Sequence, residues 1–168
     1  MQEAAALDPL SGLLGGRDPL CAGALCTRIL TIARRDTPLV DAARRMREDH
    51  VGCVVVADPS PSGDVAVGLL TDRDIVVSVV AMGLDGRALC VSDVMTPEPA
   101  VVREDDPLGA VLALMRRRGV RRVPVVSGGG VLVGLLTFDD LVAALTLQTQ
   151  ALTETLVAGR QREGQNHS

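Results

Sequence analysis

Two pairs of side chains in this sequence have the chemistry and spacing to bind a ligand, and each pair is a threonine followed three residues later by an aspartate. The first pair is Thr71 and Asp74, and the second is Thr137 and Asp140. Both threonines stand where an apolar strand gives way to a helix, and free backbone amides at a helix start attract anions. The hydroxyl adds a donor, and an ionised aspartate accepts hydrogen bonds from two hydroxyls. The pattern therefore indicates a ligand with an anionic group and vicinal hydroxyls, such as those of ribose.

The two pairs differ in the residues between them. Arg73 gives the first pair a cation that suits phosphate, whereas the second pair has Phe138 and Asp139 there and no cation. We therefore expect the first site to tolerate phosphates better and the second to suit a nucleoside or a cationic ligand. Thr-x-x-Asp is also close to a capping box, in which both side chains satisfy backbone amides. We therefore expect both pairs to cap their helices, with ligand binding in addition to the cap.

Each pair ends one copy of a longer repeated pattern. Pro38 and Pro107, 69 positions apart, each follow a capping residue and open an amphipathic helix. The apolar stripes are Leu39, Ala42, Ala43 and Met46 in one copy, and Leu108, Val111, Leu112 and Met115 in the other. Predicted strands are Ile29–Ile32, Val51–Ala57 and Val65–Leu70, then Ala100–Val102, Val120–Val126 and Val131–Leu136. Each unit therefore reads strand, helix, strand, strand, helix.

The repeats predict an α/β fold of two β-α-β-β-α units, related by pseudo-two-fold symmetry and joined as one module. We place the first unit at residues 26–83, a linker at 84–90 and the second unit at 91–146. Residues 1–25 are expected to be an N-terminal tail, and 147–168 a helical extension and tail. Apolar runs such as Val51–Ala57 suit strands that are covered on both faces.

Composition narrows the function classes. The chain has 168 residues, of which 47% are hydrophobic and 1% aromatic, with a net charge of −4. Aromatic stacking platforms for single-stranded nucleic acid and aromatic cages for quaternary ammonium ligands are therefore excluded. The four cysteines form no Cys-x-x-Cys pair, no stretch suits a bilayer span, and no secretory signal is evident. These features predict a reduced, cytoplasmic protein without a membrane partner.

The repeated signature Gly-h-h-Thr-x-x-Asp-h, where h is apolar, resembles a tandem pair of CBS domains, often called a Bateman module. The family's Gly-x-x-h-Pro neighbourhood is also present, as Gly119–Pro124. The resemblance covers residues from about Cys26 to Leu145 and extends to small stand-alone bacterial members. It implies a regulatory module, not an enzyme, that needs no cofactor. Its expected ligand is an adenosine derivative such as AMP, ADP, ATP, S-adenosylmethionine or NAD, bound between the repeats.

The resemblance also implies roles for particular residues. Asp74 and Asp140 would hold ribose hydroxyls, and Thr71 and Thr137 would meet phosphate or ribose, with Arg73 beside the first pair. The adenine would be lined by the stretch Val120, Arg121, Arg122, Val123 and Pro124. The first repeat departs from this pattern, because His50 replaces the glycine and Val55 replaces the proline. Its adenine pocket is therefore the less well supported of the two.

Other candidates are weaker. The cluster Arg116–Arg118 with Arg121 and Arg122 suits a solvated helix C-terminus better than nucleic acid. An isolated His50-x-x-Cys53 lacks the second ligand pair of a zinc site, so no metal is expected, and no catalytic nucleophile–base set is present. The family commonly forms homodimers, and binding is expected to signal to a client protein. Two alternatives remain: a ligand-free interaction module that docks through its helices or the Leu145–Leu156 extension, and an arginine-cluster nucleic-acid binder.

Overall fold

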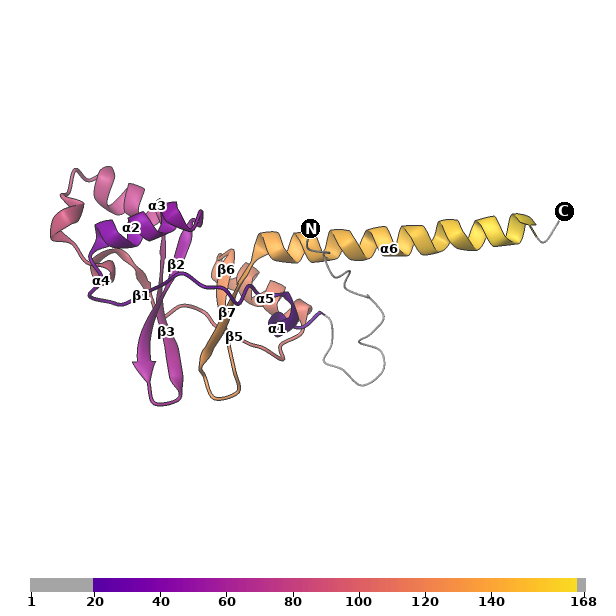
Figure 1. The fold of residues 1–168 in the computed structure, drawn as a ribbon, viewed down its shortest axis with the longest axis horizontal. Helices are drawn as coiled ribbons and strands as arrows, with labels where there is room; N and C mark the ends of the chain where they lie inside the picture. Colours follow the sequence, from indigo (N-terminus) through magenta and orange to yellow (C-terminus); the bar gives the residue numbers. More distant parts are fainter. Residues whose placement is uncertain (1–19, 166–168) are drawn as a thin grey trace, which may run out of the picture.

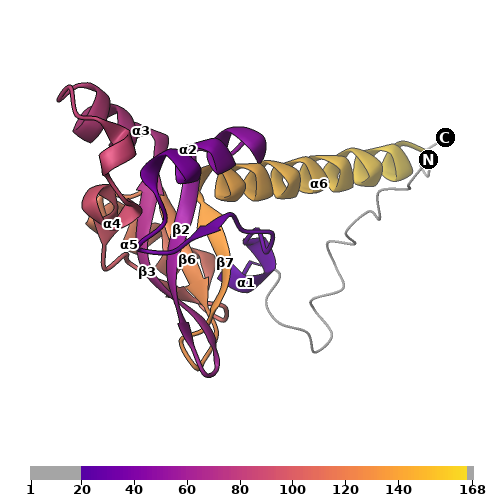
Figure 2. The same ribbon diagram turned by 60° about the vertical axis from the view of Figure 1, so that its left-hand side comes forward.

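The protein folds as two α/β halves with one long helix that extends away from the second half (Figure 1). The computed structural model describes residues 20–165, with side chains placed as far as residue 157. A view turned by 60° shows the two hairpins, β2–β3 and β6–β7, side by side, with α6 leaving the body at one end (Figure 2). No helix in the described part of the chain is long and apolar enough to cross a membrane.

The first half is built on a four-stranded sheet in the order β1-β2-β3-β4. Strand β1 pairs parallel with β2, and the other neighbours are antiparallel. The segments are α1 (Ala22–Leu25), β1 (Ile32–Ala33), α2 (Leu39–Glu48), β2 (Cys53–Ser60), β3 (Gly63–Thr71), α3 (Asp72–Ile75), the π-helical turn η2 (Val76–Val80), the 3-10 turn η3 (Gly86–Ala88), α4 (Val91–Val94) and β4 (Thr96–Pro97).

The second half repeats the arrangement on a three-stranded sheet in the order β5-β6-β7. Its elements are β5 (Val102–Arg103), α5 (Leu108–Arg118), β6 (Arg122–Val126), β7 (Leu132–Thr137) and α6 (Phe138–Gln165). Strand β5 pairs parallel with β6, and β6 pairs antiparallel with β7. The predicted α/β fold of two strand-helix-strand-strand-helix units is confirmed. The leading strands β1 and β5 begin two to three residues later than the apolar pattern suggested.

The two long helices of the body, α2 and α5, form where the apolar stripes predict them. The buried residues of α2 are Leu39, Ala42 and Met46. The buried residues of α5 are Leu108, Val111 and Met115. The expected capping residues have a different role, because neither helix has a side-chain cap. Instead, the Thr37 hydroxyl accepts from the Arg34 N–H at 2.9 Å, and Asp106 accepts from the Arg103 N–H at 2.8 Å. These side chains close the turn before each proline.

The short helix α1 directly precedes the first repeat but packs on the second half, whereas α4 directly precedes the second repeat but packs on the first half. The Ala22 N–H donates to the Asp106 carbonyl at 2.8 Å, and the Val91 N–H donates to the Thr37 carbonyl at 2.9 Å. Ala22 is buried in the core of the second half, whereas Val91 is buried in the core of the first. Residues 20–25, which the sequence pattern groups with a tail, therefore complete the second half.

Two glycines allow the crossing segments to approach the sheets. A Cβ on Gly134 would collide with the Cys26 sulfur, and a Cβ on Gly68 would collide with the Met95 sulfur. These are the first residues of the two Gly-h-h-Thr signatures. Each signature glycine is therefore the place where the segment that leads into the other repeat crosses the sheet. Side chains cannot be added there without moving that segment.

Candidate ligand-binding site

Both Thr-x-x-Asp pairs form capping boxes of nearly identical geometry. In the first, Asp74 Oδ2 accepts from the Thr71 N–H at 2.8 Å and from the Thr71 hydroxyl at 2.7 Å. In the second, Asp140 Oδ2 accepts from the Thr137 N–H at 2.9 Å and from the Thr137 hydroxyl at 2.7 Å. Each aspartate N–H donates back to its threonine oxygen at 3.2 Å. The capping interpretation is therefore confirmed for both pairs.

The capping boxes use only one carboxylate oxygen of each aspartate. Within residues 20–165, no hydrogen bond is formed by Oδ1 of Asp74 or of Asp140. An ionised carboxylate has room for about four hydrogen bonds over its two oxygens. Capping and ligand binding are therefore compatible, because the cap fixes the carboxylate and leaves its second oxygen available to a bound hydroxyl.

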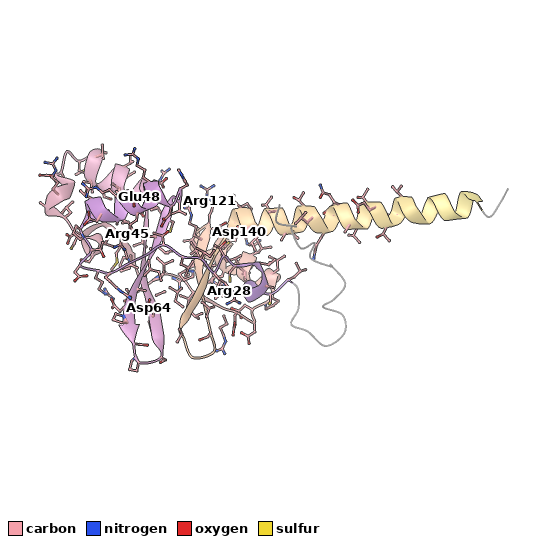
Figure 3. The ribbon with its side chains drawn as sticks, in the orientation of Figure 1. Arg28, Arg45, Glu48, Asp64, Arg121 and Asp140 are labelled. Atoms are coloured by element: carbon pink, nitrogen blue, oxygen red, sulfur yellow. The ribbon has the colours of Figure 1, made fainter. Side chains whose placement is uncertain are left out.

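A cavity of about 220 Å³ lies between the two halves and includes the second of these pairs. The first half lines it with residues of two neighbouring stretches, Thr27, Ile29, Leu30 and Thr31, then Val51, Gly52, Cys53 and Val55. The second half contributes Arg122, Leu135, Thr137 and Asp140. Figure 3 shows Asp140 at the base of α6, above the sheet of the second half.

The wall made by residues 27–31 is an extended segment that spans the boundary between the halves. Its start is attached to β7, because Thr27 and Leu135 exchange backbone hydrogen bonds of 2.9 and 3.0 Å. Its end is attached to β2, because the Val55 N–H donates to the Thr31 carbonyl at 3.1 Å. Between these two anchors, Ile29 is 92% exposed. The large apolar side chain of Ile29 therefore lies beside the cavity and does not pack into either hydrophobic core.

Arg122 and Cys53 occupy equivalent positions in the two repeats, and both line the cavity. Each begins the first strand of its hairpin, with Arg122 opposite Thr137 and Cys53 opposite Thr71. Burial raises the pKa of the Cys53 thiol to about 11, and the positive charge of Arg122 opposes that rise. The guanidinium forms no hydrogen bond or ion pair with residues 20–157. The cavity wall therefore includes an unpaired cation.

The other predicted site residues lie elsewhere. Val123 and Pro124 are fully buried in the second half, because β6 is a central strand covered on both faces. Val120 and Arg121 line a separate hollow beside Phe138, and Figure 3 shows Arg121 at the start of β6. Thr71, Arg73 and Asp74 are outside the cavity wall. The predicted residues that the structure brings together are Arg122, Thr137 and Asp140.

The first-half wall was missed by reasoning from the sequence. That reasoning placed the adenine beside its own repeat's Gly-x-x-h-Pro stretch, whereas the cavity joins the second signature to Val51–Cys53 of the first repeat. The sequence pattern placed Ile29 at the start of a strand, and only the structure shows that its side chain is 92% exposed beside the cavity. The departure of this repeat from the family pattern bears on the cavity directly, because Val55, which replaces the proline, forms part of its wall.

The fold and the repeated signatures define a tandem pair of related α/β modules, and comparison with known proteins names the family. The sequence model of the CBS domain matches residues 22–81 and 91–147. The chain therefore belongs to the CBS-domain family, with two CBS domains in tandem. The first matched segment begins in α1, in agreement with the structural role of residues 20–25.

Relatives of known sequence and structure share this organisation. The chain is 33% identical over 132 residues to the protein YlbB of Bacillus subtilis, which covers 76% of this chain and 85% of that one. It is 32% identical over 118 residues to the protein MK0525 of Methanopyrus kandleri, over 66% of this chain but only 59% of that one. Among solved structures, the cytosolic domain of the Mg2+ channel MgtE in complex with ATP matches with a TM-score of 0.63 and 27% identity, over 76% of this chain and 50% of that chain.

Proposed function

We propose that this protein is a regulatory module that binds the adenosine part of a nucleotide in the cavity between its two CBS domains. The observation that carries the proposal is the wall of that cavity. It holds a carboxylate with an available oxygen at Asp140, an unpaired guanidinium at Arg122, and apolar surface from Ile29, Val51 and Leu135. A ribose, a phosphate and a base require these three kinds of surface.

Each wall residue has a distinct role in this proposal. Asp140 Oδ1 accepts hydrogen bonds from the ribose hydroxyls, and Thr137 holds the carboxylate in place through the 2.7 Å bond to Oδ2. Ile29 and Val51 cover the faces of the adenine, since the chain offers no aromatic platform. Backbone N–H groups of Ile29 and Leu30 have no hydrogen-bond partner among residues 20–165, so they are available to the edge of the base.

The size of the cavity supports a nucleoside as the enclosed group. Ligand pockets for drug-sized molecules usually measure roughly 300–1,000 Å³. At about 220 Å³, this cavity would enclose one nucleoside and leave phosphates at its rim beside Arg122. The MgtE domain, which shares the fold at 27% identity, is a structure in complex with ATP, and this supports the same class of ligand here.

The first signature remains a predicted second site with a different preference. Thr71 and Asp74 form the same kind of capping box as the second pair. Arg73 places a cation within this signature, where the second signature has Asp139. This supports the prediction that the first site tolerates phosphates better than the second.

Regulation follows from the position of the cavity. A ligand held by residues 27–31 on one side and Asp140 on the other connects both halves. It therefore shifts the protein toward whichever arrangement it contacts best. We propose that a client protein senses that arrangement, and that the module acts in the cytoplasm as a homodimer with no catalytic step of its own.

Calorimetric titration with AMP, ATP and S-adenosylmethionine tests the proposal. Asp140→Ala removes the ribose acceptor of the cavity, and Asp74→Ala removes the equivalent cap outside it. Each substitution is expected to cost about 1 kcal/mol of stability through the lost cap, so the pair is matched. We expect Asp140→Ala to abolish binding in the cavity, with one site per chain lost from the stoichiometry.

Three outcomes would decide against the proposal. Binding that survives in Asp140→Ala but disappears in Asp74→Ala would place the ligand at the first signature instead. Binding of a client protein that is unchanged by both substitutions, with no nucleotide bound to the wild type, would favour the ligand-free interaction module. A steep fall of nucleic-acid binding with salt would favour the arginine cluster as the functional surface.

A further inference from the structure

Helix α6 (Phe138–Gln165) carries a large apolar surface that the rest of the chain does not cover. Its 28 residues correspond to about 42 Å, and most of that length extends beyond the body of the protein (Figures 1 and 2). Leu141, in its first turns, is fully buried against the second half. By contrast, Leu152 and Leu156 are 67% and 66% exposed.

Five exposed apolar residues of α6, together with one threonine, follow the spacing of a coiled-coil seam. Intervals of four and three residues alternate without interruption along one stripe, which consists of Phe138, Val142, Leu145, Thr149, Leu152 and Leu156. All six side chains are exposed. This is the a/d pattern in which two helices pack knobs into holes. Leu147 and Val157, which are also exposed, lie outside this stripe.

The middle of this seam carries no charge that would repel an identical chain, and Asp139 stands beside its first residue. No charged residue stands between Asp140 and Glu154. The hydroxyls of Thr146, Thr149 and Thr153 each donate to the backbone carbonyl four residues earlier, at 2.9 Å. Their hydroxyl donors are therefore used within the helix, so Thr149 brings no unpaired donor into the seam.

The seam continues into an apolar hollow at the base of α6. Phe138, the first seam residue, lines this hollow of about 450 Å³. The other lining residues are Leu112, Met115, Gly119 and Val120, with Arg116 and Arg121. A partner helix lying parallel to α6 brings a second body to the same end, where both hollows are then covered. An antiparallel partner would place the two bodies at opposite ends of the seam.

We propose that α6 pairs with α6 of a second copy of this chain as a parallel two-stranded coiled coil along the seam from Phe138 to Leu156. Like residues then face each other across the two-fold axis, so Thr149 meets the threonine of the second copy. The seam is independent of the nucleotide cavity, and the dimer forms with or without ligand.

Sedimentation equilibrium of Leu152→Asp beside Leu147→Asp tests the seam. Both leucines lie on α6 with nearly equal exposure, 67% and 65%, so the change in helix propensity and solubility is matched. The wild type and Leu147→Asp are expected to be dimers. Leu152→Asp is expected to raise the dissociation constant of the dimer by at least about a hundredfold, because it places two carboxylates in the seam. A monomeric wild type, or a Leu152→Asp dimer of unchanged affinity, would overturn the proposal.

Oxidative cross-linking tests the orientation. In the parallel pair, a cysteine introduced by Leu152→Cys faces its own copy, and peptide mapping distinguishes this disulfide from any formed by the four native cysteines. Leu147→Cys, outside the seam, is expected to cross-link far more slowly. A link that forms only between Leu152→Cys and Val142→Cys chains would show an antiparallel pair and overturn the parallel arrangement.

Discussion

The backbone N–H of Leu108, at the start of α5, donates to the carbonyl oxygen of Leu20 at 2.9 Å. The equivalent bond, from the Leu39 N–H to the Leu89 carbonyl, measures 3.0 Å and joins the same elements of the other repeat. Each CBS domain therefore obtains part of its helix start and core from the segment that precedes the other domain. This exchange also places residues 27–31 across the cavity, so the crossing that stabilises the fold is the crossing that builds the site.

A charge at Ala22 should destabilise the second half. Ala22 is fully buried there, and Ala22→Asp would bury an unpaired carboxylate, at an expected cost of roughly 3 kcal/mol or more. Urea unfolding measures this difference. The matched control is Ala24→Asp, on the exposed side of the same short helix, which should change the free energy of unfolding little. Equal losses in the two variants would contradict the role given to α1.

Adding one methyl group at Gly134 should displace the segment at Cys26, which crosses over the sheet there. The new Cβ would collide with the Cys26 sulfur, so we expect Gly134→Ala to cost about 1–3 kcal/mol of stability and to weaken nucleotide binding. Cys26→Ala in the same chain should restore part of both. Gly109→Ala, on the open face of α5, is the control and should stabilise the protein by up to about 1 kcal/mol. No rescue by Cys26→Ala would show that the sulfur is not the obstacle.

Alkaline pH should weaken the fold through Cys53. Burial raises its pKa from 9.0 to about 11, so the folded state favours the neutral thiol. The neutral thiol then contributes on the order of 2 kcal/mol to the free energy of unfolding. This contribution is fully present below pH 9 and is lost as the pH rises through 11. The chain has no tyrosine or lysine, so thiols dominate titration in this range. The free energy of unfolding should fall less in Cys53→Ala, and an identical fall would contradict this assignment.

Ile29 should matter for the ligand and not for the fold. Its side chain is 92% exposed, so Ile29→Ala should leave the melting temperature unchanged. If it covers the base, its removal should lower nucleotide affinity roughly tenfold, as expected for about 1.4 kcal/mol of lost apolar contact. Val80→Ala, which shortens another exposed apolar residue away from the cavity, is the calorimetric control. A lower melting temperature for Ile29→Ala, or an unchanged affinity, would contradict this role.

The absorption spectrum of the purified protein offers a further test. Without tryptophan or tyrosine, the chain itself should be nearly transparent in the near ultraviolet. A nucleotide that co-purifies would therefore dominate the spectrum through its adenine. We expect this absorption to decrease in Asp140→Ala, and absorption that is equal in both proteins after the same purification would show that it comes from another source.

Local patterns in the sequence predicted the fold well. The stripes under α2 and α5, the two hairpins and both Thr-x-x-Asp caps depend on residues within a few positions of each other, and all of them form. Thr37 and Asp106 were predicted to cap the helices that follow Pro38 and Pro107, and this prediction was wrong. Each side chain lies close both to the helix start and to the turn before it, and each accepts a hydrogen bond from the turn. The predicted division at residues 26–83 and 91–146 has no independent test, although it leaves α1 outside the half that it completes.

The sequence by itself determined that this chain is a tandem repeat with two equivalent capped carboxylates, because a repeat is visible wherever short-range patterns recur. Only the tertiary structure decided which carboxylate borders the cavity. Residues 27–31 reach Asp140 by pairing with β7, and that contact joins positions more than a hundred residues apart, for which no local pattern exists. The same packing turned Val123 and Pro124 into core residues, since a central strand is covered on both faces.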